Sequence, residues 1–120
     1  MENVPEPAPP QACNVATILA LKDTTTVVNG KWKTAIIYSL AFGRKRYNEL
    51  LKGIPKMNPR MLSKELKELE MNGIVSRTIH DSFPVVIDYA LTPAGFAFKE
   101  TILDAMLRWG LEHRKAVFGK

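Results

Sequence analysis

Two short helical segments joined by a tight turn lie in the middle of this chain, and they restrict its possible folds more than any other feature. Apolar residues recur at helical spacing from Tyr47 to Ile54, and Pro55 cannot continue that helix. Asn58-Pro59 then starts a second helix, because asparagine is a strong N-cap and proline suits the first helical position. This helix is expected over residues 59–72 and ends at Asn72-Gly73. The pair predicts a helix-turn-helix.

A β-hairpin is predicted directly after the helix pair. Residues 74–80 and 85–91 are rich in β-branched and apolar side chains, and the polar turn 81–84 separates them. The alternation in the second run predicts one buried face. Thr92-Pro93 then caps and opens a last helix that is expected to reach about His113. The fold class is therefore predicted to be mainly α with a small β-hairpin wing, which is a winged helix-turn-helix.

The segment before the helix pair is expected to hold an arm and two helices. Residues 1–12 contain four of the eight prolines, so they are predicted to be a disordered, Pro-rich arm, and residues 13–120 are predicted to form one domain. A first helix from Val15 to Leu21 is expected to break in the β-branched run 24–28, with Asp23 as a cap. A second helix is expected over 31–42, with these residues inward: Trp32, Ala35, Ile36 and Leu40.

Positive charge is concentrated in one part of the sequence. The net charge is +5, and residues 44–77 hold nine Lys or Arg against four Glu, whereas the rest of the chain is balanced. A localised basic region attracts a polyanion such as nucleic acid. A solvated surface that only keeps the protein soluble would give the same excess. Charge alone leaves both interpretations open.

The predicted helix at 59–72 separates its apolar residues from its basic ones. A helical wheel puts Leu62, Leu66 and Leu69 on one side and Arg60, Lys64 and Lys67 on the other. Arg60 and Lys64 are four residues apart and repel each other unless an anion lies between them. Arginine bonds guanine bidentately in the major groove, and lysine serves bases or phosphates. We therefore expect this face to contact double-stranded DNA.

Other residues are expected to support that contact. Asn58 and Ser63 belong to the N-terminal part of the helix, which recognition helices present to base edges. The loop 44–46 is placed to reach the phosphate backbone, and the hairpin tip, 77–82, is placed to touch the flanking minor groove, although Asp81 weakens that prediction. The full predicted DNA-binding set is Asn58, Arg60, Ser63, Lys64, Lys67, Arg44, Lys45, Arg46, Arg77 and His80.

Four short motifs occur in order along the chain: Gly30-Lys31-Trp32-Lys33, Arg46-Tyr47-Asn48-Glu49-Leu50, the run 60–67, and Tyr89-Ala90-Leu91-Thr92. Between about Leu19 and Gly110 the sequence resembles the HxlR-type family of bacterial winged helix-turn-helix regulators. The resemblance implies a homodimeric, cytoplasmic transcription regulator of MarR-related architecture that binds a two-fold operator. It makes residues 13–120 a DNA-binding and dimerisation domain.

The single cysteine departs from that family pattern. Many members carry a redox-sensing cysteine upstream of the tryptophan in the Gly-Lys-Trp motif, and Leu19 stands at about that place here. Cys13 lies earlier, beside the Pro-rich arm, and Lys22 is its nearest basic residue. A thiol switch across a dimer interface and a passenger or packing cysteine both stay open.

Two apolar stripes run along the last predicted helix. One of them can cover the core of its own subunit: Phe96, Leu103, Met106 and Leu107. The other needs a further partner: Phe98, Ile102, Ala105 and Trp109. A two-fold partner would space two recognition helices for successive major grooves, so we expect these four residues at a homodimer interface. A helix buried on both sides within one subunit is the alternative.

Several other classes find no support in the sequence. No apolar run approaches the ~20 residues that span a bilayer, and residues 1–12 do not read as a secretory signal, so we expect a cytoplasmic protein without a membrane partner. Phosphate-loop and hydrolase motifs are missing, and Cys13, His80 and His113 have no metal-ligand spacing. We expect no enzyme, metal or cofactor. A protein-interaction module without specific DNA binding is the alternative function, and any small-molecule effector is unknown.

Overall fold

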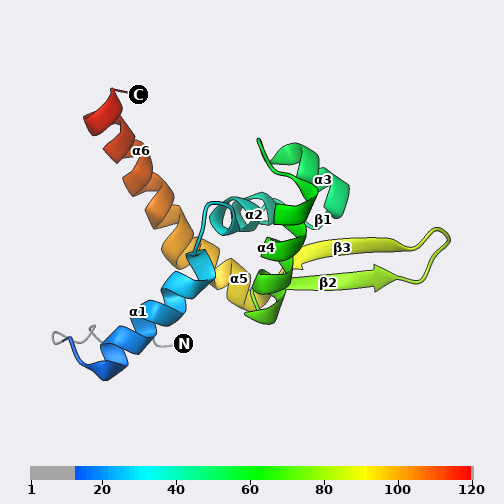
Figure 1. Ribbon diagram of the computed structural model, residues 1–120, viewed down its shortest axis with the longest axis horizontal. Coiled ribbons are helices and arrows are strands. Elements are labelled where there is room, and N and C mark those ends of the chain that lie inside the picture. The colour runs from blue at the N-terminus through cyan, green and yellow to red at the C-terminus, as the bar shows by residue number, and fades with distance from the viewer. Residues whose placement is uncertain (1–12, 120) are drawn as a thin grey trace, which may run out of the picture.

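The computed structural model describes residues 13–119 of the chain, and the predicted Pro-rich arm lies outside this range. The described chain is mostly helical and includes a three-stranded antiparallel sheet of order β1-β3-β2 (Figure 1). The predicted winged helix-turn-helix class is confirmed. In chain order, the elements are α1 (Val15–Val28), α2 (Lys33–Leu40), β1 (Lys45–Arg46), α3 (Tyr47–Gly53), α4 (Pro59–Met71), β2 (Val75–His80), β3 (Val86–Leu91), α5 (Pro93–Phe98), the π-helical η1 (Lys99–Leu103) and α6 (Asp104–Phe118).

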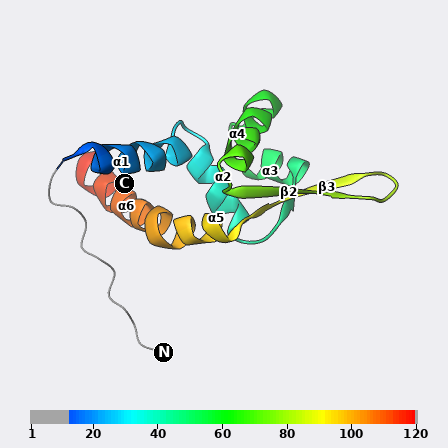
Figure 2. The ribbon, with the colours of Figure 1, turned by 90° about the horizontal axis from the view of Figure 1, so that it is seen from below.

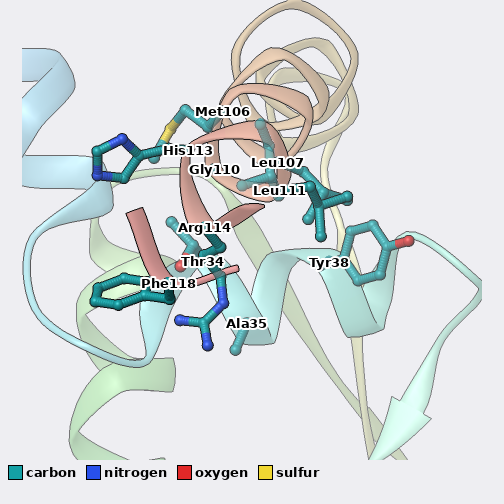
Figure 3. Close-up of a pocket in the computed structure, with 11 residues that line it drawn as sticks. Thr34, Ala35, Tyr38, Met106, Leu107, Gly110, Leu111, His113, Arg114 and Phe118 are labelled. Atoms are coloured by element: carbon teal, nitrogen blue, oxygen red, sulfur yellow. The ribbon is translucent and has the colours of Figure 1, made fainter. Parts of the chain in front are cut away.

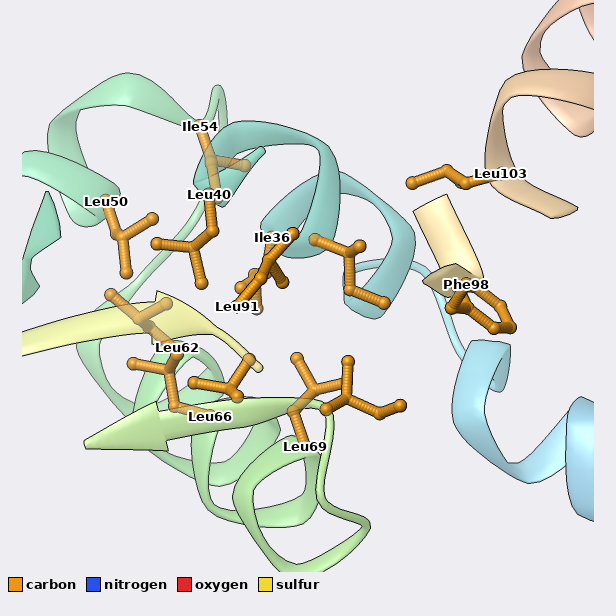
Figure 4. Packing of buried hydrophobic residues seen from close by; sticks show 13 residues of the cluster. Ile36, Leu40, Leu50, Ile54, Leu62, Leu66, Leu69, Leu91, Phe98 and Leu103 are labelled. Atoms are coloured by element: carbon orange, nitrogen blue, oxygen red, sulfur yellow. The ribbon is translucent and has the colours of Figure 1, made fainter. Parts of the chain in front are cut away.

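The hydrophobic core lies between α2, α3, α4 and the sheet (Figure 4). The three leucines of α4 that the wheel placed inward are buried in one cluster with Ile36 and Leu40 of α2. Ile37, which was not predicted to point inward, is fully buried as well. Each such side chain stabilises the fold by about 1.5–3 kcal/mol relative to exposure. The core thereby fixes which side of α4 remains outside.

The turn between α3 and α4 follows the local signals in the sequence closely. Helix α3 ends at Gly53, and Ile54 closes it by donating a backbone hydrogen bond to the carbonyl of Leu50. Asn58 caps α4, since its Oδ1 accepts a hydrogen bond of 2.9 Å from the backbone N–H of Met61. Pro59 occupies the first turn, as predicted.

The first strand was not predicted. Lys45 and Arg46 were expected in a loop, but they pair with Tyr89 and Asp88 of β3. The Lys45 ammonium also donates a hydrogen bond of 2.8 Å to the carbonyl oxygen of Ser39 at the end of α2. Two consecutive basic residues carry no alternating apolar pattern, so only the pairing with β3 reveals the strand.

The outer half of the hairpin extends beyond the helices (Figures 1 and 2). The strands fall close to the predicted ranges, but the expected single buried face of the second run is wrong. Only Leu91, at the end next to the core, is buried, and the rest of β3 is half-buried. Ile79, Phe83 and Val85 are exposed. Alternation predicts a buried face only where another layer covers the sheet, and among residues 13–119 no layer covers the outer half of this hairpin.

Helix α1 is longer than expected because three threonines are accommodated within it. A break was predicted in the run 24–28 with Asp23 as a cap, yet the helix continues to Val28. The hydroxyl groups of Thr24, Thr25 and Thr26 each donate a hydrogen bond of 2.7–3.0 Å to the carbonyl oxygen four residues earlier. These bonds satisfy the polar side chains inside the helix.

The C-terminal helix contains a π-helical segment, and it runs to Phe118 instead of about His113. One π turn adds a residue to the helical repeat, so residues five apart come to lie on the same side. Phe98 and Leu103 are both buried in the core for this reason. The predicted separation of these two residues into opposite stripes is therefore wrong.

A close backbone contact joins α5 to the start of β2. Gly95 is buried, and a Cβ atom there would lie 2.3 Å from the carbonyl oxygen of Ile74. Thr92 caps α5 by accepting a hydrogen bond of 3.1 Å from the Gly95 N–H. Its own hydroxyl donates to the carbonyl oxygen of Gly73 at 2.6 Å. Only glycine at position 95 permits this close contact between α5 and the backbone of Ile74.

Candidate nucleic-acid interface

Helix α4 presents a basic face to solvent. Leu62, Leu66 and Leu69 hold its other side in the core, while Arg60, Lys64 and Lys67 are all exposed. This separation is the one predicted from the wheel. Arg60 belongs to the first turn of the helix, and Lys64 follows one turn later. The exposed side of α4 is therefore a cationic surface on a rigid element.

Two predicted contact residues in the first turns of α4 also have structural roles. Asn58 uses its carbonyl oxygen as the helix cap. The Tyr47 hydroxyl donates to the backbone oxygen of Pro59 at 2.8 Å and lies 3.0 Å from Oγ of Ser63. Since Tyr47 begins α3, these bonds set the angle between the two helices of the motif. Ser63 fixes α4 against α3 as well as lying near the basic face.

An ionic cluster, which the sequence analysis missed, anchors α4 to α2. The Lys33 ammonium is buried and lies 2.8 Å from Oε2 of Glu65, and it also bonds to Glu68. Burial alone would lower the pKa of Lys33, but the two carboxylates raise it above its usual value. The hydrogen bond from Lys33 lowers the pKa of Glu68. Glu65 falls within the leucine stripe of the helical wheel. A carboxylate on this apolar side was the sequence signal that could have predicted a buried ion pair.

Three of the predicted DNA-binding residues surround one carboxylate. Nε2 of His80 lies 2.7 Å from Oδ2 of Asp88, and the Arg44 and Arg46 guanidinium groups lie 3.8 and 3.9 Å from the same carboxylate. Both arginines are more than half exposed, whereas the Asp88 side chain is 16% exposed. Asp88 was not predicted as a site residue, because its partners come from two other parts of the chain, the 44–46 segment and the end of β2.

Arg77 and Lys45 lie elsewhere than expected. Arg77 was assigned to the hairpin tip, but it pairs with Tyr89 in mid-strand. There it lines a cleft of about 250 Å³ between α4 and the sheet, together with Lys67 and Glu70. Lys45 directs its ammonium to Ser39 at the end of α2, so it is engaged within the fold. Arg77 therefore lies beside Lys67 of α4, while Arg44 and Arg46 form a separate group around Asp88.

The predicted dimer-facing residues are not on one surface. Phe98 is buried in the core of its own subunit, and Ile102 is half-buried against that core. Ala105 and Trp109 are exposed, and the Trp109 ring stacks on His113 with 4.6 Å between ring centroids. The π-helical turn explains this redistribution, because the predicted stripe assumed an uninterrupted α-helix.

An open, apolar groove runs between α2 and α6 (Figure 3). Its volume is about 540 Å³, and side chains of both helices line it, including Tyr38, Met106, Leu107, Leu111 and Phe118. Most of the large apolar side chains of α6 are exposed along this groove or beside it.

Within residues 13–119, no helix is both long enough and apolar enough to cross a membrane.

The helix-turn-helix, the basic face of α4 and the attached β-hairpin define a winged helix-turn-helix transcriptional regulator. A model of the HxlR-like helix-turn-helix family matches residues 27–117, and the chain belongs to this family. The chain is 35% identical over 101 residues to the uncharacterized HTH-type transcriptional regulator YtcD of Bacillus subtilis (strain 168), and the match covers 84% of this chain and 79% of that protein.

Solved structures of two other regulators are similar to the chain. The redox regulator HypR in its reduced form superposes with a TM-score of 0.77 at 35% identity, covering 84% of this chain and 99% of that one. The reduced form of the transcriptional regulator YodB from B. subtilis has a TM-score of 0.67 at 32% identity, covering 82% and 91%. These matches agree with the resemblance derived from the four sequence motifs.

Proposed function

We propose that this protein binds double-stranded DNA as a homodimer and regulates transcription from a two-fold operator. The observation that carries the proposal is the division of α4, whose leucines lie in the core while Arg60, Lys64 and Lys67 stand exposed. Membership of a helix-turn-helix regulator family supports the same partner. Because such a regulator acts on chromosomal DNA, we expect it in the cytoplasm.

In the proposed complex, α4 lies in the major groove with its first turns toward the base edges. Arg60 suits bidentate hydrogen bonding to guanine, and Lys64 and Lys67 bond to bases or phosphates. Arg60 and Lys64 repel each other in the free protein, and the attraction of both side chains to the DNA phosphates outweighs this repulsion in the complex. The cations of the 44–46 segment add contacts to the phosphate backbone.

Helices α1 and α6 support the proposal of a dimer. No residue of α1 is buried, and Ile18, Leu19 and Leu21 are exposed along it. A 14-residue helix is only marginally stable alone in water, so this surface needs a partner. Trp109 on α6 offers a further exposed apolar surface. A two-fold axis between copies covers both surfaces at once and spaces the two α4 helices about 34 Å apart, one turn of DNA.

Fluorescence anisotropy tests the proposed reading of DNA. The duplex upstream of the protein's own gene and a random duplex of equal length are titrated at several salt concentrations. We expect log affinity to fall linearly with log salt, and the operator to bind about 1,000-fold more tightly or better. An Arg60→Ala, Lys64→Ala double variant should lose most of this preference, because each base contact contributes about 1–3 kcal/mol.

The matched control removes two positive charges far from α4. Lys22→Ala with Lys115→Ala changes one exposed residue on α1 and one on α6. Because both helices belong to the proposed dimer surface, sedimentation must first show that this variant is still dimeric, and it should then keep the operator preference. Unchanged affinity in the α4 double variant would sink the proposed reading face. Equal affinity of the wild type for operator and random duplex would favour the alternative, a protein-interaction module built on the same fold.

A response to oxidation is a second, narrower proposal. Cys13 is free and exposed, and it directly precedes Asn14, the cap of α1. Because α1 belongs to the proposed dimer surface, oxidation would join two Cys13 thiols across the subunits. Similarity to the redox regulator HypR supports this reading. Mild oxidation followed by non-reducing electrophoresis should give a linked dimer in the wild type and none in Cys13→Ser; identical patterns would remove the proposal.

A further inference from the structure

Asp88 lies in the middle of the central strand of the wing, where an acidic residue is unexpected. It is directly opposite Arg46 of β1 on one side and Thr78 of β2 on the other. Aspartate is depleted in strands, and a half-buried carboxylate loses part of its hydration. Its presence next to a surface proposed to bind phosphates therefore needs a physical reason.

The geometry around Asp88 supplies one. Its carboxylate accepts a hydrogen bond from His80 at 2.7 Å and faces the guanidinium groups of Arg44 and Arg46 at 3.8 and 3.9 Å. Within residues 13–119, no other carboxylate lies within 4.0 Å of either guanidinium group. One anion thus holds three groups from the loop before β1, from β1 itself and from β2.

The cluster is connected to α4 through adjacent residues. Arg46 is the cap residue of α3, and Tyr47, which follows it, bonds to Pro59 and lies against Ser63 of α4. A phosphate bound by Arg46 is therefore fixed relative to the first turns of α4. Contacts to phosphates set the register of a protein on DNA even though they carry no sequence information themselves.

We propose that Asp88 is a positioning residue for DNA binding, holding Arg44 and Arg46 in the orientation that meets the phosphate backbone. The proposal rests on the proposed function. Without the carboxylate, the two guanidinium groups repel each other and sample more rotamers, while the local surface becomes more positive. Attraction to any duplex then rises, and the preference for the correct register falls.

The test compares operator with random duplex for the wild type, Asp88→Asn and Asp88→Glu. Asparagine keeps the shape but removes the charge. We expect Asp88→Asn to lower the ratio of operator to random affinity about tenfold, with random-duplex affinity unchanged or higher. Asp88→Glu should restore most of the ratio. An equal loss of affinity for both duplexes would show that Asp88 only supports the sheet, and it would overturn the proposal.

A second measurement asks whether Asp88 acts through the arginines. In an Arg44→Ala, Arg46→Ala background, Asp88→Asn should change the affinity ratio no further, because the groups that it positions are gone. The same tenfold loss in that background would contradict the proposal. Thermal melting of each variant confirms that the comparison is made between folded proteins.

A third measurement needs no DNA, so it separates this proposal from the proposed function. In ¹⁵N relaxation measurements of the free wild type, the Nε–H of Arg46 should show restricted motion, because the Asp88 carboxylate faces the guanidinium group at 3.9 Å, and Asp88→Asn should lower its order parameter. An unchanged order parameter overturns the positioning role, whatever the DNA titrations show. A wild type without operator preference overturns the proposed function, while the relaxation data still decide whether Asp88 holds Arg46.

Discussion

The helix-turn-helix unit and the two long helices outside it cover their apolar residues in different ways. Helix α4 has internal partners for its whole inner side, namely the leucine cluster and the Lys33 ion pairs. Neither α1 nor α6 contains a fully buried residue. The first region is complete within one subunit, which leaves its outer face available for charge. The second region leaves large apolar side chains exposed, and the proposed dimer would cover them.

The two regions should stabilise the protein in different ways, one within each subunit and the other through association. Contacts around α4 should determine the unfolding of each subunit independently of protein concentration. Contacts along α1 and α6 should matter only through association, so their effect should vary with concentration.

Lys33→Met should destabilise the helix-turn-helix unit most. It leaves Glu65 buried without its counterion, which typically costs about 3–5 kcal/mol. Urea unfolding should show this loss at all protein concentrations. A Lys33→Met, Glu65→Leu double variant should recover most of it, because no charge then remains buried. Lys31→Met, at an exposed neighbouring position, is the control and should change little; a comparable loss there would discredit the ion-pair explanation.

Trp109→Ala should act on association and not on the subunit. The side chain is 68% exposed, and its ring contact is with His113 on the same helix. A tryptophan at the centre of an interface contributes about 2 kcal/mol to the free energy of association. In a two-fold dimer this contribution is lost from both subunits. Sedimentation should show dissociation at concentrations where the wild type is dimeric. Met71→Ala is the control, because it removes an exposed apolar side chain from α4 and not from α6, and it should leave the dimer intact. Dissociation of both variants alike would argue against this interface.

Gly95→Ala tests the junction between the two regions. The added methyl group would lie 2.3 Å from the carbonyl oxygen of Ile74, so α5 must shift away from the sheet. Strain of this kind costs roughly 1–3 kcal/mol. Thermal melting should show the loss, whereas Gly110→Ala, where nothing lies within 4 Å of the new methyl group, should not. A wild-type melting temperature for Gly95→Ala would contradict the prediction, because it would mean that α5 accommodates the added methyl group without strain.

Acidification should produce the smallest effect and should arise at Glu68. Its pKa is lowered in the folded state by the hydrogen bond from Lys33. The stabilisation is therefore fully present above the ordinary glutamate pKa of about 4.3 and is lost as the pH falls through the lower folded value. The free energy of unfolding should decrease below about pH 4. Glu68→Gln should show a shallower decrease, and parallel profiles would remove Glu68 as the source.

Local signals predicted the helix-turn-helix and the basic face well. Asn58, Pro59 and Thr92 act through residues in the same turn, so their capping roles can be read from the chain alone. The leucine stripe needs only one covered side, which α2 and the sheet supply. The wing was less predictable, since its outer half has no covering layer. The candidate site was also incomplete, because Asp88 gathers partners that are distant in sequence.

Local sequence patterns were enough to predict where the central helices begin and end and which side of α4 carries charge. These properties depend on neighbours within one or two helical turns. The pairing of Lys33 with Glu65 and the short strand at Lys45 became visible only in the fold, because each joins segments far apart in the chain. The π turn that moved Phe98 into the core was also visible only there, because the apolar pattern of this segment fits an uninterrupted α-helix.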